Sequence, residues 1–283
     1  MAKRKTSRLR KATSILVSFL LAFLLFILSF MLVMQAVLFN ESALINSINE
    51  SCYIEEKNSE ITRDLKDLGY ASGLNESFFE GLLDYSLIYS DTVEYLENFY
   101  AGTGSVVNDS DFREIFNKSL DNYVIKNKID PATVDKGSRE YLVSSAAKIY
   151  RASLELPLFR TIAGYFLGIK NMLPIAMIVV GVLIILLSIA MFGIARWKHR
   201  ACKYLCCSTI TVFLATLAPA IALKVSGVVE QFNISSRATY QLFIAVGNNF
   251  TMMLIYFSIF YAIVSMILYL LYRHYRIKRS SRL

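Results

Sequence analysis

The side chains that most often carry acid–base or metal chemistry are few in this sequence. Its two histidines, His199 and His274, each lie in a short stretch rich in lysine and arginine. A histidine that acts as a base or binds a metal needs a carboxylate or further ligands close to it. Neither stretch contains an acidic residue, so we expect no catalytic or metal site around a histidine.

Two groups of carboxylates have the composition that can hold a cation. Glu55, Glu56 and Glu60 form one group, and Asp64 with Asp67 forms the other. Their spacing is also that of the water-facing side of an amphipathic helix, which is the simpler explanation. We therefore assign no metal site to them.

Residues 108–111, with the sequence NDSD, resemble the beginning of a calcium-binding loop. Such a loop has a glycine at its sixth position and a glutamate at its twelfth, and this sequence has neither. Helix capping is the better explanation for these residues. The sequence thus predicts no catalytic, cofactor-binding or metal-binding residue, and no cofactor.

The four cysteines are also poor candidates for chemistry. Cys52 is the only cysteine in the acidic part of the chain, so no disulfide within the chain can cross-link that part. Its thiol is either buried or bonded to another chain, and we favour burial. Cys202, Cys206 and Cys207 lie beside lysine and arginine at the edge of an apolar segment, where acylation is the alternative to a packing role that we favour.

Four long stretches of the chain carry no charge, at residues 12–40, 171–195, 204–223 and 238–272. About 20 apolar residues are enough for a helix to cross the hydrocarbon core of a bilayer. The sequence therefore predicts four transmembrane helices, with the last one confined to residues 248–272. The first stretch is longer than the apolar core of a signal peptide and lacks its small-residue cleavage motif, so we expect an uncleaved anchor.

The sign of the charges indicates the orientation of these helices. Fifteen of the 30 lysines and arginines lie in three stretches without any acidic residue, and 21 of the 22 acidic residues lie in one region, residues 41–170. Basic stretches next to membrane helices stay in the cytoplasm. We therefore predict a plasma-membrane protein with both termini in the cytoplasm. The cytoplasmic segments would be residues 1–11, 196–203 and 273–283, and the outer segments residues 41–170 and 224–247.

Apolar residues in the large outer region recur at the spacing of helices, without the alternation typical of strands. One helix is expected to continue from the first membrane segment through residues 44–68. Asp91 with Glu94, and Asp111 with Glu114, have the spacing of capping boxes that begin helices.

A last helix of this region begins at Ser138 and approaches the second membrane segment. Pro157 is expected to kink it, because proline cannot donate the backbone hydrogen bond of a straight helix. The predicted fold class is an all-α integral membrane protein with four transmembrane helices. A helical extracytoplasmic domain, residues 41–170, is inserted between the first and second helices.

This order of elements resembles the permease subunits of mechanotransmitting ABC systems of the cell-division and macrolide-exporter type. The resemblance implies an outer domain that relays conformational work. Those permeases usually have a longer cytoplasmic segment between their second and third helices than residues 196–203, and their outer domains are mixed α/β. The arrangement also resembles chemoreceptor-type sensors, which carry a cytoplasmic output domain where this sequence shows about 11 residues at either end. Both resemblances imply a partner protein.

We expect a non-enzymatic multi-pass membrane protein whose outer helical domain senses, binds or scaffolds a protein partner and couples it to the membrane helices. The alternative is a transport or channel subunit that works with an ATPase or as an oligomer. An enzyme is a third possibility. The predicted spans contain no ionisable residue for an ion-coupled carrier.

The net charge of +8 and the isoelectric point of about 9.2 reflect the basic cytoplasmic stretches. They are an orientation signal rather than a nucleic-acid-binding surface, so no nucleic-acid partner is expected. The lipid bilayer is the expected partner of the apolar helices, and the basic cytoplasmic rim should attract anionic lipid.

Overall fold

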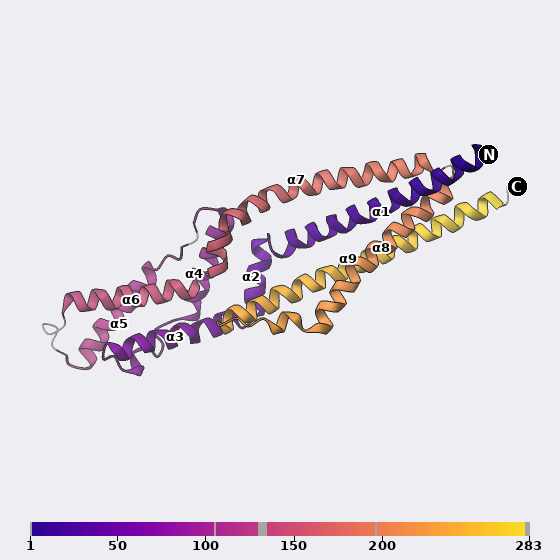
Figure 1. Ribbon diagram of the computed structural model, residues 1–283. Coiled ribbons are helices and arrows are strands. Elements are labelled where there is room, and N and C mark those ends of the chain that lie inside the picture. Colours follow the sequence, from indigo (N-terminus) through magenta and orange to yellow (C-terminus); the bar gives the residue numbers. More distant parts are fainter. Residues whose placement is uncertain (1, 105, 130–134, 196, 281–283) are drawn as a thin grey trace. The chain divides into compact units, whose positions relative to one another are not determined.

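The computed structural model describes residues 2–104, 106–129, 135–195 and 197–280, and this part of the chain forms helices and no β-strand. The helical fold class predicted from the sequence is thus confirmed for the described residues. In chain order the helices are α1 (Ala2–Val37), α2 (Glu41–Glu50), α3 (Tyr53–Ala71), the 3-10 helix η1 (Glu76–Phe78), α4 (Tyr85–Ala101), α5 (Ser110–Lys126), α6 (Lys136–Leu154), α7 (Pro157–Ile194), α8 (Lys198–Ser226), the 3-10 helix η3 (Val228–Gln231) and α9 (Arg237–Ser280) (Figure 1).

The helices belong to two compact units. One unit, called the membrane unit here, comprises Met1–Phe39, Ile169–Gln231 and Gly247–Leu283. The other, called the bundle unit, comprises Asn40–Gly168 and Phe232–Val246. Helices α7 and α9 each begin in the bundle unit and continue into the membrane unit. The bundle unit is therefore built from two separate stretches of the chain.

Four helices are long and apolar enough to cross a membrane, as the sequence predicted. Their candidate spans have mean hydropathies between 2.0 and 3.1. The spans are Arg10–Val37, Ala163–Ile194, Lys198–Ser226 and Arg237–Lys278.

Buried hydroxyl groups join α1, α8 and α9 inside the membrane unit. Ser18 of α1 and Ser208 of α8 lie 2.8 Å apart, and Ser29 of α1 lies 2.7 Å from the hydroxyl of Tyr261 in α9. Helices α8 and α9 share two further pairs, Thr216 with Ser258 and Thr209 with Ser265, each at 2.9 Å. Such bonds can hold helices together in lipid, where apolar side chains gain little by leaving the solvent.

Helix α7 packs much less than its neighbours. In the most apolar 18 residues of each candidate span, the share of buried residues is 6% in α7, 22% in α1 and in α9, and 33% in α8. Near its end, Met191 packs in a small cluster with Leu21 of α1 and Leu205 of α8. The hydroxyl of Ser188 bonds to the Ile184 carbonyl of its own helix.

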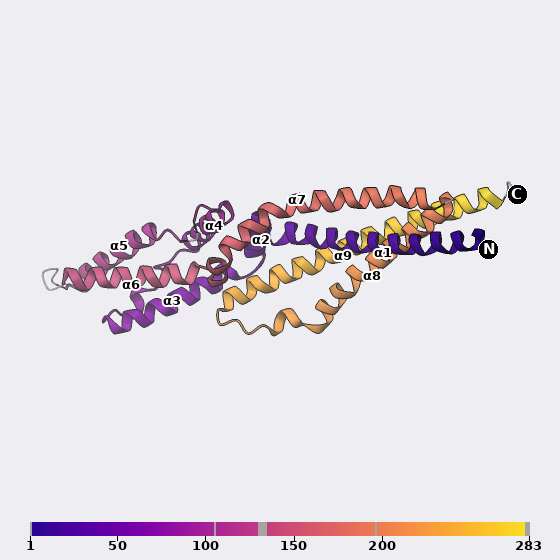
Figure 2. The ribbon, with the colours of Figure 1, turned by 45° about the horizontal axis from the view of Figure 1, so that its top comes forward.

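The bundle unit has an aromatic core in place of a hydroxyl network. Phe112 of α5 stacks on Tyr150 of α6, with ring centroids 4.3 Å apart and planes only 6° apart. Phe78 makes edge-on contacts with Phe116 and Tyr123, each at 5.5 Å. Both views of the ribbon show α5 beside α6, in agreement with their packing (Figure 2).

The predicted helix through residues 44–68 is two helices, and it does not continue from α1. Helix α1 ends at Val37, α2 ends at Glu50 and α3 begins at Tyr53, with Ser51 in an extended conformation (φ −101°, ψ 160°). Both α2 and α3 bury one apolar face, so the apolar spacing persists across the break and does not reveal it.

The first predicted capping box is wrong. Helix α4 begins at Tyr85, and its N-cap is Asp84. Asp91 lies within α4, where its carboxylate is buried and accepts a 2.6 Å hydrogen bond from the Tyr150 hydroxyl. The Asp91–Glu94 spacing therefore reflects positions inside a helix.

Two other predicted boundaries also move. Asp111 does not cap a helix with Glu114, because α5 already begins at Ser110 with Asp109 at its N-cap. The predicted kink at Pro157 is replaced by a helix boundary: α6 ends at Leu154 and α7 begins at Pro157. Proline is well suited to the first position of a helix, where its missing N–H has no partner to lose.

Candidate functional site

The first turn of α9 is held by side chains of the bundle unit. Ser236 precedes the helix, and its hydroxyl accepts a 3.1 Å hydrogen bond from the backbone N–H of Thr239. This is the usual bond from an N-cap residue to the third residue of a helix. The α9 start therefore carries a local cap of its own.

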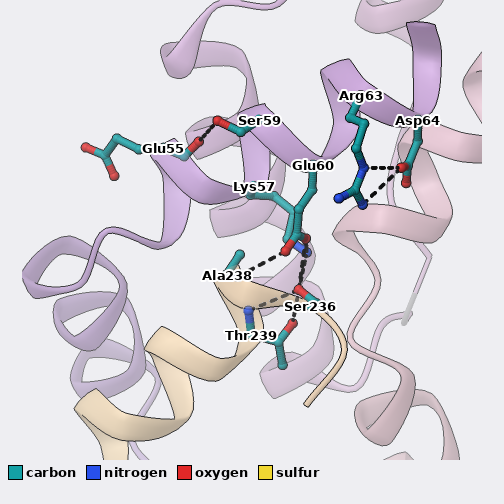
Figure 3. Close-up of polar contacts among 9 residues, drawn as sticks. All are labelled: Glu55, Lys57, Ser59, Glu60, Arg63, Asp64, Ser236, Ala238 and Thr239. Carbon is teal, nitrogen blue, oxygen red and sulfur yellow. Dashed lines mark hydrogen bonds and ion pairs between the residues drawn. The ribbon is translucent and has the colours of Figure 1, made fainter. Parts of the chain in front are cut away.

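Glu60 of α3 supplies a second cap from a distant part of the chain. One carboxylate oxygen accepts a 3.1 Å bond from the N–H of Ala238, and the other accepts a 2.9 Å bond from the Ser236 hydroxyl (Figure 3). A carboxylate at a helix N-terminus also interacts favourably with the helix dipole. The Glu60 side chain therefore stabilises the N-terminus of α9 both by hydrogen bonding and by its negative charge.

Lys57, one turn before Glu60 on α3, completes the cluster. Its ammonium group donates to Glu60 at 3.0 Å and to Ser236 at 3.2 Å, and it lies 5.6 Å from the ring centre of Tyr53. Lys57 is only 3% exposed. A charge buried to this degree is tolerated only when it is paired, so Glu60 is needed by Lys57 as well as by α9. Lys57, Glu60 and Ser236 are called the α9 latch below.

The latch keeps Glu60 ionised. Burial alone would raise the pKa of this carboxyl, but the ammonium of Lys57 and the hydrogen bonds from Ala238 and Ser236 outweigh burial and lower it. The charge that caps α9 is therefore retained at neutral pH.

Neighbouring charges on α3 are less involved. Arg237 and Glu56 form a 2.9 Å ion pair whose arginine is 72% exposed, and pairs so exposed contribute little to stability. Glu55 points away from the latch, and Arg63 pairs with Asp64 on α3 itself (Figure 3). The predicted water-facing side of α3 is therefore divided between solvent and α9.

A second polar network lies between α4, α5 and α6. One carboxylate oxygen of Asp109 lies 3.1 Å from the Nε atoms of both Arg113 and Arg151, and these are ion pairs without hydrogen-bond geometry. Close by, burial raises the pKa of Asp91, the hydrogen bond from Tyr150 opposes this effect, and other carboxylates add to it. These contacts join α4, α5 and α6.

The other residues singled out in the sequence do not converge. His199 lies in the first turn of α8, and His274 lies near the end of α9 with its ring 5.7 Å from that of Tyr275. Among the described residues, no three histidine, cysteine, aspartate or glutamate side chains are placed to hold a metal ion.

The cysteines require one correction. Cys52 is exposed at the start of α3, so the predicted burial of its thiol is wrong. Cys52 is the N-cap residue of α3, and its side chain is exposed while the neighbouring Tyr53 is fully buried. Cys202 and Cys206 are buried in α8 and Cys207 is exposed.

Comparison with protein families, curated proteins and solved structures found no match to this chain. The latch therefore has to be interpreted from its own geometry. Sequence reasoning missed it because Glu60 and Ser236 are 176 residues apart. Two weak local signals were present, namely the opposite charges of Lys57 and Glu60 at helical spacing and a serine just before an apolar run.

Proposed function

We propose that this chain is a non-enzymatic multi-pass protein of the plasma membrane, with both termini in the cytoplasm and the bundle unit outside. The charge distribution supports this orientation, because the three acid-free basic stretches all flank candidate spans of the membrane unit. The bundle unit contains residues 41–168, where almost all acidic residues lie.

The bundle unit would sense, bind or scaffold a partner protein and couple it to the membrane helices. The α9 latch is the observation that carries this proposal. Glu60 and Lys57 belong to α3, yet they hold the first turn of a helix that continues without a break into a candidate membrane span. A change in α3 would therefore alter the start of that span.

The alternative of a transport subunit has less support. The outer domains of the ABC permeases that the chain resembles are mixed α/β, whereas the described residues of the bundle unit form helices without strands. An enzyme has no support from the latch, whose charged groups are occupied by one another and by the α9 backbone.

The coupling can be tested by releasing the latch and measuring the effect first at the start of α9 and then in the membrane unit. In the full chain in lipid nanodiscs, Glu60→Gln should leave Lys57 buried without a counter-charge. We expect backbone hydrogen exchange across residues 237–246 to accelerate by at least about tenfold, as a loss of more than 1.4 kcal/mol of local stability would produce. Glu55→Gln is the matched control, since it makes the same change on an exposed position of α3.

The same variants then carry spin labels at two exposed positions of the membrane unit, Thr211 on α8 and Met266 on α9. Coupling predicts that Glu60→Gln changes the distribution of distances between the labels and that Glu55→Gln does not. If exchange at residues 237–246 accelerates while the label distances stay unchanged, α9 is released locally and the coupling role is wrong.

A further inference from the structure

The bundle unit contains a groove of about 700 Å³ at one end of its helices. Its walls are the end of α3 with the turn that follows, the last turns of α5 and the first turns of α6. Pockets that bury small molecules usually measure about 300–1,000 Å³, so the groove has a suitable size.

The lining of the groove is mainly apolar. Leu74, Leu120, Val124 and Leu142 contribute aliphatic surface from all three walls, and Tyr123 and Tyr141 contribute aromatic surface. Phe78 packs edge-on against the Tyr123 ring, with the ring centroids 5.5 Å apart. Tyr141 is 73% exposed, so its ring is largely open to solvent among the described residues.

The charged groups of the lining are already paired. Asp135 caps α6, accepting hydrogen bonds from the N–H and the hydroxyl of Ser138 at 2.8 and 2.9 Å. Arg139 donates to Asp121 at 2.6 Å and to the backbone carbonyl of Asn117 at 3.2 Å. A charged ligand would have to compete with these bonds, whereas an uncharged ligand would leave them intact.

The two tyrosines are the polar groups left for a ligand. Among the described residues, neither the Tyr123 nor the Tyr141 hydroxyl forms a hydrogen bond within the groove wall. A tyrosine hydroxyl can donate to or accept from an uncharged polar group.

We propose that this groove binds an uncharged small molecule with an aromatic or aliphatic body and one hydrogen-bonding group. The body would cover the leucines and Val124, and the polar group would bond to a tyrosine hydroxyl. This proposal rests on the proposed function in one respect: the bound molecule would be the signal that the bundle unit senses. Binding itself is measured without reference to the α9 latch.

The test uses the full chain in lipid nanodiscs and three probes that differ in charge: 4-phenylbutan-1-ol, 4-phenylbutyrate and 4-phenylbutylamine. Ligand-detected nuclear magnetic resonance gives the affinity of each, with empty nanodiscs as the baseline for partition into lipid. We expect saturable binding of the alcohol and at least tenfold weaker binding of the two charged probes.

Two tryptophan variants locate the binding site. Ala71→Trp places a large ring in the groove, and Ala101→Trp makes the same change at an exposed end of α4 outside it. The alcohol should bind Ala101→Trp as it binds the natural chain and bind Ala71→Trp at least tenfold more weakly. Tyr141→Phe, a milder change, should weaken binding several-fold.

Several outcomes would overturn the assignment: uptake of the alcohol no greater than by empty nanodiscs, equal affinity for both tryptophan variants, or preference for a charged probe. If binding fails while Glu60→Gln still changes the label distances, the ligand assignment is wrong and the coupling stands. If the alcohol binds the groove while Glu60→Gln leaves the label distances unchanged, the ligand assignment stands and the coupling role is wrong.

Discussion

The core of the bundle unit contains many fully buried aromatic rings, whereas in the membrane unit the contacts between helices include a series of hydroxyl pairs. Phe112 and Tyr150 represent the first kind of contact, and Ser18 with Ser208 the second. The membrane unit presents its large apolar side chains outward, as on α7, where Ile175, Ile178 and Ile185 are each at least 60% exposed.

Under the proposed arrangement, with the bundle unit in water and the membrane unit in lipid, the difference follows from the solvent around each unit. Water drives apolar side chains inward at roughly 25 cal/mol per Å² of surface, so a bundle in water is stabilised by its aromatic core. Lipid provides no such force, and helices in it associate through close packing and hydrogen bonds between helices. The two units therefore differ in what holds them together, and four experiments can break or sharpen that comparison.

The largest expected effect concerns the proposed orientation, which would place the two units in different solvents. In a chain whose own cysteines are replaced, single cysteines at Ser77 and Ser235 should react with a membrane-impermeant thiol reagent on intact cells. Both positions are exposed in the structure. Cysteines at Ser7 and Ser281, in the basic stretches that we propose to be cytoplasmic, should react only after lysis. Reaction of either terminal cysteine on intact cells would exclude the proposed orientation.

The next effect compares the loss of a large apolar side chain in each unit. Phe112→Ala should cost the bundle unit about 3–5 kcal/mol, because the ring is fully buried against Tyr150. Ile178→Ala on α7, where the side chain is 68% exposed, should change stability by less than about 0.5 kcal/mol. Hydrogen exchange resolved by helix measures both. Similar losses would mean that α7 is covered by something other than lipid.

A smaller effect is expected for a hydroxyl pair. Ser208→Ala removes the bonds of this hydroxyl to Ser18 and should cost the membrane unit about 0.6–1.7 kcal/mol. Ser188→Ala is the matched control, since this hydroxyl bonds only within α7 as far as the described residues show. Unfolding in mixtures of detergent and sodium dodecyl sulfate measures the difference. Equal costs would remove the hydroxyl pairs as a source of helix association.

The sequence was sufficient to predict the features that depend on composition and local spacing. The four candidate spans follow from long stretches without charge, and the helical class follows from the 3.6-residue recurrence of apolar residues. The prediction of helix starts failed where an aspartate can either cap a helix or pair with a residue of another helix. Asp91 has the type and spacing of a cap, but its carboxylate meets Tyr150 of α6, which local sequence does not reveal.

The latch could not be predicted for a related reason. Lys57 and Glu60 have the spacing of an exposed pair on a helix, and only the fold brings Ser236 to them. Their burial depends on the return of residues 232–246 to the bundle unit. Contacts between segments so far apart in sequence leave no periodic pattern, so the residues that join α3 to α9 become visible only in the structure.

The smallest expected effect is a pH dependence that arises in the bundle unit and has no counterpart among the hydroxyl pairs. Burial raises the pKa of Asp91, with further contributions from Asp111 and Glu94, and the hydrogen bond from Tyr150 only partly offsets these effects. An acid whose pKa is higher in the folded state binds its proton more tightly there than in the unfolded chain, where the pKa is about 3.9. The stability of the bundle unit should therefore fall as the pH rises from that value through the raised pKa.

Asp91→Asn can still accept the Tyr150 hydrogen bond and cannot ionise, so the variant should match the natural chain at low pH and exceed its stability at neutral pH. Hydrogen exchange of α4 and α6 as a function of pH gives this difference, and a difference that does not change with pH would show that Asp91 ionises as freely in the fold as in the unfolded chain.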